Sequence, residues 1–131
     1  MAMEMQVKFH GGVKIDAIFN EFTFKTDQPV EDGGENTAPS PFLYFLASLA
    51  SCAGFYVVSF CNERNIDTTG LALKMAWDWN EDTHRIDHIR LDLTLPIGFP
   101  EKYKPAVLRT VDLCTVKKHI MSPPEIKIEL L

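Results

Sequence analysis

Cysteine thiols are the side chains of this sequence with the most distinctive chemistry. The chain contains three, Cys52, Cys61 and Cys114, separated by nine and 53 residues. No Cys-x-x-Cys motif occurs, so the spacing favours neither a structural zinc site nor a local dithiol motif. Three cysteines are also too few for a disulfide framework. Each thiol is therefore either a small buried hydrophobic group or a reactive one.

Two of these thiols lie on one predicted helix. Ser40 and Pro41 suit the N-cap and the first position of a helix, which we expect to end near Arg64. Cys61 follows Cys52 by nine residues, and at about 100° per residue it points to the opposite face. These two thiols cannot act together, and we expect Cys61 to pack in the core. The third thiol lies where two further helical patterns meet.

The predicted helix carries no charge from Ala38 to Cys61. Its length would allow it to cross a membrane, but it contains several Ser and Tyr residues, and no Lys or Arg immediately precedes it. We therefore expect no membrane span. A helix that is apolar on all sides needs protein on all sides, which a dimer of this short chain supplies more easily than a monomer.

The remaining pattern predicts an antiparallel α+β protein with a single domain over residues 1–131. Small residues at helical spacing, including Ala47 and Gly54, predict a stripe where another element approaches closely. We expect strands over 6–10 and 13–24 joined at Gly11-Gly12, a loop over 25–37, strands over 71–80 and 86–95, helices over 101–113 and 115–121, and a last strand over 126–130.

Composition limits the classes of function. The 131 residues carry a net charge of −5, with 46% hydrophobic and 24% charged residues, so we expect a globular protein that does not bind nucleic acid. The first five residues have neither the basic nor the apolar segment of a signal peptide, which predicts a cytoplasmic protein with reduced thiols. His84 and His88 fall in a predicted turn and strand, and we expect no metal there.

The segment around Cys52 resembles the OsmC/Ohr family of thiol peroxidases. The resemblance lies in Ala38-Pro39-Ser40-Pro41, in the uncharged helix reaching Ala50-Ser51-Cys52, and in a second cysteine at Cys114-Thr115-Val116-Lys117-Lys118. The order of elements is similar along essentially the whole chain. The resemblance implies an OsmC-like fold, with antiparallel sheets around a long buried central helix in an intertwined homodimer whose active sites lie at the subunit interface.

The resemblance also implies a mechanism. Cys52 would be the peroxidatic thiol that attacks an organic hydroperoxide and becomes a sulfenic acid. Cys114 would be the resolving thiol that condenses with it to a disulfide, which an external dithiol reductant would reduce. Neither a cofactor nor a metal is implied. The Lys117-Lys118-His119 cluster could lower the pKa of Cys114, or it could be an ordinary solvated helix end.

Two positions depart from the family pattern. Active members place an arginine in the N-terminal region and a glutamate early in the cysteine helix, and together these stabilise the thiolate. Here the first arginine is Arg64, and Phe42 stands ten residues before Cys52. The cations that could substitute are Lys14, Lys25 and Arg109, while Glu35 lies in the preceding loop. The alternative is an OsmC-fold protein without peroxidase activity that binds a small apolar or thiol-containing ligand at the dimer interface.

Overall fold

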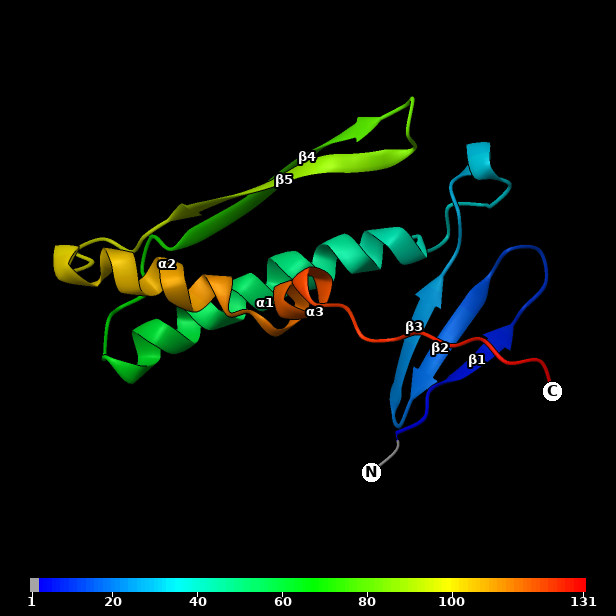
Figure 1. The fold of residues 1–131 in the computed structure, drawn as a ribbon, viewed down its shortest axis with the longest axis horizontal. Coiled ribbons are helices and arrows are strands. Elements are labelled where there is room, and N and C mark those ends of the chain that lie inside the picture. Colours follow the sequence, from blue (N-terminus) through cyan, green and yellow to red (C-terminus); the bar gives the residue numbers. More distant parts are fainter. Residues whose placement is uncertain (1–2) are drawn as a thin grey trace. The chain divides into compact units, whose positions relative to one another are not determined.

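The computed structural model describes residues 3–131 and divides the chain into two compact units, Met1–Ala47 and Ser48–Leu131. Each unit is described by itself below. The elements are β1 (Gln6–Phe9), β2 (Ile15–Phe19), β3 (Phe22–Thr26), η1 (Val30–Asp32), α1 (Pro41–Glu63), β4 (Ala72–Asn80), β5 (Arg85–Thr94), η2 (Glu101–Tyr103), α2 (Lys104–Asp112) and α3 (Thr115–Met121) (Figure 1). The antiparallel α+β prediction is confirmed, whereas the single domain stays a prediction.

The first unit contains a three-stranded antiparallel sheet in the order β1-β2-β3. The predicted turn at Gly11-Gly12 is confirmed, and both glycines have positive φ angles of 87° and 56°. The single strand predicted over 13–24 is wrong, because it folds back on itself at Asn20-Glu21 and pairs Phe19 with Phe22. Asn20 makes this turn possible with a φ of 52°, a left-handed conformation that asparagine tolerates.

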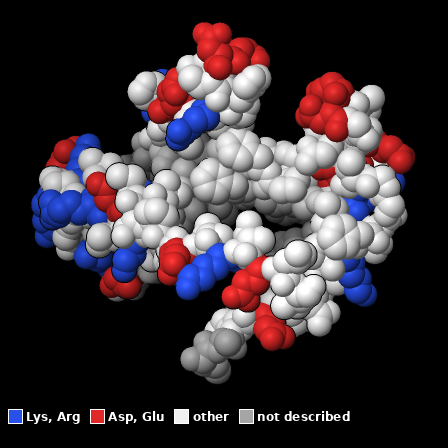
Figure 2. Space-filling view, turned by 45° about the vertical axis from the view of Figure 1, so that its right-hand side comes forward, with Lys and Arg blue, Asp and Glu red and all other residues white. Residues whose placement is uncertain are grey.

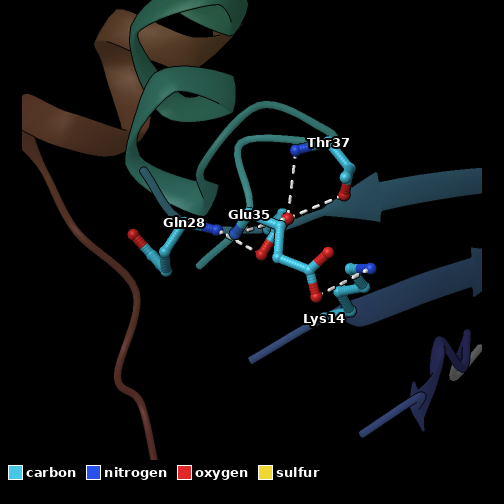
Figure 3. A network of polar contacts seen from close by, with 5 residues as sticks. Lys14, Gln28, Glu35 and Thr37 are labelled. Carbon is cyan, nitrogen blue, oxygen red and sulfur yellow. Dashed lines mark hydrogen bonds and ion pairs between the residues drawn. The ribbon is translucent and has the colours of Figure 1, made fainter. Parts of the chain in front are cut away.

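The polar loop after β3 is organised around the buried carboxylate of Asp27. One Asp27 oxygen accepts the backbone N–H of Gln28 at 2.8 Å, and the other accepts those of Glu35 and Thr37 at 3.2 and 3.0 Å. The Thr37 hydroxyl donates a fourth hydrogen bond at 2.7 Å. Figure 3 shows this network beside the Lys14–Glu35 ion pair. These bonds hold the pKa of Asp27 well below its ordinary value.

The long helix α1 begins as the sequence predicts. Ser40 Oγ accepts the backbone N–H of Leu43 at 3.2 Å, and Pro41 is the first helical residue. The helix ends at Glu63, and Asn65 follows in a left-handed conformation. Its length and apolar composition would suffice to cross a membrane, a criterion that the core helix of a soluble protein also meets.

One face of α1 is buried within the second unit. Ala53, Val57 and Phe60 recur at helical spacing and are almost fully buried. On another face, Phe55 is 65% exposed and Val58 38%. The chain therefore buries one side of the helix, and coverage of the remaining sides by a second copy stays a prediction.

The second unit contains the two-stranded hairpin β4-β5. Trp77 pairs with Ile89 and Trp79 with Ile86, so a bulge adds one residue to β5 between these pairs. Both tryptophans lie on one face of β4, as the alternation predicts, and the bulge lets Ile86 and Ile89, three residues apart on β5, pair with them. Acidic side chains gather at the exposed end of this hairpin (Figure 2): Asp78, Glu81, Asp82 and Asp87.

The core of the second unit lies between α1, α2 and the segment before η2. It is built from Val57, Phe60, Cys61, Phe99 and Val107. The ring of Phe60 meets those of Phe99 and Tyr103 at centroid distances of 6.2 and 5.9 Å. This packing, together with Val107 of α2 in the same core, holds α2 against α1, which in turn places the residues that follow α2.

The strand predicted over residues 126–130 is wrong. The segment from Pro123 to Leu131 forms no helix or strand. Ile126, Ile128 and Leu130 are 81%, 96% and 100% exposed, although they alternate with charged residues as a strand would. Alternation predicts a strand only if a neighbouring strand accepts its hydrogen bonds, and the structure pairs this segment with none of the described strands.

Candidate functional site

Cys52 and Cys114 lie close together in the second unit, near enough for the Cys52 thiol to affect the pKa of Cys114. Cys52 is half-buried in the middle of α1, whereas Cys114 is 1% exposed and stands between α2 and α3. All three cysteines of the chain are free thiols. The structure thus places an accessible thiol near a buried one, and two neighbouring thiols of this kind can form a reversible disulfide.

Burial is the main cause that raises the pKa of the Cys114 thiol. The backbone N–H groups of Lys117 and Val116 oppose this effect, because they stabilise a thiolate. The neighbouring Cys52 raises the pKa further, since a protonated Cys114 can donate to Cys52 and two adjacent thiolates would repel each other. Cys114 therefore keeps its proton when Cys52 carries a negative charge.

Cys114 is held at the N-terminal end of α3. Cys114 is the N-cap of this helix, and its Sγ accepts the backbone N–H of Lys117 at 3.3 Å. The next residue, Thr115, shares a hydrogen bond of 2.9 Å with the hydroxyl of Tyr56. Tyr56 follows Cys52 by one turn of α1, so this bond joins the two helices directly beside the two sulfurs.

An apolar hollow of about 230 Å³ adjoins the buried thiol. Its walls come from α1, β5, α2 and α3, and they include Leu49, Ala53, Leu91 and Ile120 together with Cys114 itself. Lys117 and Asp112 also line it and form an ion pair with each other. A hollow of this kind would accept a small apolar molecule near the thiol pair.

Cys61 plays the structural role that its position in the helix predicts. It is completely buried in the core next to Val57 and Phe60, and burial raises the pKa of its thiol. The charge of Arg64 partly opposes this rise. The thiol of Cys61 therefore stays protonated and unreactive at neutral pH.

None of the predicted cations is among the groups that shift the pKa of Cys114. The ammonium of Lys117 pairs with Asp112, and that of Lys14 lies 3.4 Å from Glu35 within the first unit. Arg109 and Arg64 line a separate hollow of about 540 Å³ beside α2. Only the backbone of the Lys117-Lys118-His119 cluster, through the N–H of Lys117, lowers the pKa of Cys114.

The roles of two polar residues were not predicted from the sequence. Asp27 organises the loop that leads into α1, and Tyr56 bonds to Thr115 beside the thiols. A single aspartate between a strand and a Gly-rich loop is only a weak sequence signal for the role of Asp27. Nothing in the sequence signals the second, because its partner lies 59 residues away.

Comparisons with known proteins show the same fold. A protein of Psychrobacter arcticus 273-4 has a similar structure, with a TM-score of 0.75, 24% identity, and 90% of this chain and 88% of that one covered. For an OsmC-like protein from Mycoplasma pneumoniae the TM-score is 0.69 at 14% identity, with coverages of 94% and 89%. For the organic hydroperoxide resistance protein OhrB of Bacillus subtilis it is 0.53 at 18% identity, with coverages of 98% and 98%.

The fold is that of an α+β protein in which two free thiols lie close together. A family model described as OsmC-like protein matches residues 33–129, which include both Cys52 and Cys114. The chain therefore belongs to the OsmC-like protein family. No curated protein matches the sequence.

Proposed function

We propose that this protein is a thiol peroxidase that reduces organic hydroperoxides, with Cys52 as the peroxidatic thiol and Cys114 as the resolving thiol. The observation that carries the proposal is the proximity of a half-buried and a buried thiol from distant parts of the chain. The names of similar structures, such as the organic hydroperoxide resistance protein of Bacillus subtilis, agree with it.

The roles follow from exposure and charge. A peroxide in solution can reach Cys52 more easily than the buried Cys114. The thiolate of Cys52 would attack the outer oxygen of the hydroperoxide, the O–O bond would break, and the departing alkoxide would take a proton and leave as the alcohol. Cys114 would keep its own proton during this step, because its pKa is raised.

Resolution would then join the two sulfurs. Cys114 would attack the sulfenic sulfur of Cys52, forming the S–S bond while the S–O bond breaks, and the hydroxyl would leave as water with the proton of Cys114. An external dithiol would supply two electrons and two protons to restore both thiols. The apolar hollow beside Cys114 favours a substrate with a hydrocarbon body.

The partners of the proposal are a peroxide, a dithiol reductant and a second copy of the chain in the cytoplasm. The exposed apolar side chains of α1, Phe55 above all, support a homodimer, because burying them would stabilise the folded state. We propose no role for a metal, a cofactor, a nucleic acid or a membrane.

The test is single-turnover oxidation of the reduced protein with cumene hydroperoxide, followed by disulfide mapping. We expect a disulfide between Cys52 and Cys114 of one chain, and we expect Cys52→Ser to consume no peroxide. Cys61→Ser is the matched control, since its thiol is buried on the same helix and should leave turnover unchanged. An unmodified Cys52 under excess peroxide would exclude the peroxidase.

A second candidate is a binding protein of the same fold without peroxidase activity, whose ligand is a small apolar or thiol-containing molecule. The observation that favours it is that Lys117, the cation in the wall of the hollow, is already paired with Asp112. A ligand in the hollow would change the reactivity of Cys114 without being consumed. Calorimetric titration of the Cys52→Ser variant with cumyl alcohol separates the candidates, because a peroxidase should bind its product weakly.

A further inference from the structure

A hydrogen bond between Tyr56 and Thr115 links α1 to α3 close to the two thiols. Its oxygen atoms are 2.9 Å apart, and it joins α1 to the first residue of α3. Tyr56 follows Cys52 by one helical turn, while Thr115 directly follows Cys114. Each end of the bond is therefore anchored beside one of the two sulfurs.

The position of α3 depends on such contacts. The helix has seven residues and none of them is buried. An isolated helix of this length is not stable, so contacts with the rest of the protein must hold it. Disulfide geometry tolerates little displacement, because the two Cβ atoms must lie about 3.5–4.5 Å apart. A shift of α3 along or away from α1 would therefore separate Cys114 from Cys52.

We propose that Tyr56 and Thr115 are positioning residues that hold Cys114 against Cys52 and so set how readily the two thiols form a disulfide. This inference rests on the proposed function insofar as Cys114 resolves the oxidised Cys52. The tyrosine ring packs edge-on against Phe55 at a centroid distance of 5.6 Å, which orients the ring independently of its hydroxyl. Removal of the hydroxyl alone should consequently release α3 without disturbing α1.

The measurement is the effective concentration of the thiol pair in glutathione redox buffers. Each glutathione disulfide oxidises one Cys52–Cys114 pair and yields two glutathione molecules, so the balance needs no peroxide. We expect Tyr56→Phe and Thr115→Val each to lower this concentration about two- to tenfold, the range that one neutral hydrogen bond can cause. The double variant should fall no further than either single one, because both remove the same bond.

Two controls separate positioning from general stability. Tyr44→Phe removes the hydroxyl of another tyrosine on α1, which donates to the backbone oxygen of Lys25 at 2.8 Å, and it should leave the effective concentration unchanged. Thr115→Ser keeps the hydroxyl and should retain the parent value. If Tyr56→Phe behaves like Tyr44→Phe, or if Thr115→Ser falls as far as Thr115→Val, the inference is overturned.

A second measurement distinguishes this inference from the proposed function. Under excess cumene hydroperoxide, slower resolution should leave more Cys52 as sulfinic acid in Tyr56→Phe than in the parent protein. If the parent fails to react with peroxide while the glutathione values still fall as expected, the peroxidase is excluded and the positioning role is supported. If the parent turns over and the glutathione values do not change, the positioning role alone is overturned.

Discussion

Cys114 has a structural and a chemical role, and two substitutions separate them. Its Sγ caps α3 by accepting the N–H of Lys117 at 3.3 Å, and its thiol lies against Cys52. Cys114→Ser keeps an acceptor for the N–H but removes the thiol. Cys114→Ala removes both. The two variants should therefore differ in stability and agree in chemistry.

The magnitude follows from the cap and from the burial of this side chain. Serine is a preferred N-cap and alanine a poor one, a difference of about 1 kcal/mol. The side chain is 1% exposed, so the serine hydroxyl loses contact with water, but its bond with the N–H of Lys117 offsets part of that cost. We expect reduced Cys114→Ser to be more stable than Cys114→Ala by about 1 kcal/mol.

Urea unfolding under reducing conditions measures the stability, and intact mass after peroxide treatment measures the chemistry. The parent protein should lose about 2 Da as its disulfide forms, whereas both variants should gain about 16 or 32 Da at Cys52. A loss of about 2 Da in Cys114→Ser would show that another thiol resolves Cys52. If the mass change of each variant depended on its stability and not on the loss of the Cys114 thiol, the division of roles would be refuted.

Three further predictions concern pH and packing. The pKa of Cys114 is raised above its ordinary value, so disulfide formation from the sulfenic acid should accelerate about tenfold per pH unit from pH 6 to 8. Stopped flow with tryptophan fluorescence measures this rate, and a flat profile would contradict the prediction. The lowered pKa of Asp27 means that its carboxylate stabilises the fold above its unfolded pKa of about 4 and loses this effect as the pH falls. Urea midpoints at pH 7 and 3 should therefore differ more in the parent than in Asp27→Asn, and equal differences would exclude the role of this carboxylate. Gly54→Ala should stabilise α1 by about 0.5–1 kcal/mol, since the added Cβ would meet only Leu73 Cδ2 at 3.9 Å, and destabilisation in urea would mean that another backbone packs there.

Local patterns predicted most elements of this fold because their signals lie within a few residues. Ser40-Pro41 marked the start of α1, and strict alternation marked β4. The turn at Asn20 was missed because apolar residues flank the two polar residues of the turn on both sides, and the conformational tolerance of asparagine permits the reversal. The last strand was overpredicted for the opposite reason: the alternation of Ile126 and Ile128 is present, but no described strand pairs with it.

The thiol pair could be predicted only through resemblance to a family. Helical periodicity excluded cooperation between Cys52 and Cys61, yet it could not bring Cys114 to Cys52 across the intervening β-hairpin. That proximity depends on how α2 packs against α1 through Phe60 and Val107. The bond from Tyr56 to Thr115 is a consequence of the same packing, so no local pattern could reveal it.

The arrangement of the two thiols has a cost that the neighbouring residues offset. Burial protects Cys114 from direct oxidation, but it also raises its pKa and so lowers the fraction of thiolate available for resolution. A small fraction of Cys114 thiolate can still resolve the sulfenic acid quickly if its sulfur is already held close to that of Cys52, because proximity raises the rate of the reaction. On this argument removal of the bond between Tyr56 and Thr115 should slow resolution by the same factor at every pH, without changing the slope of the profile.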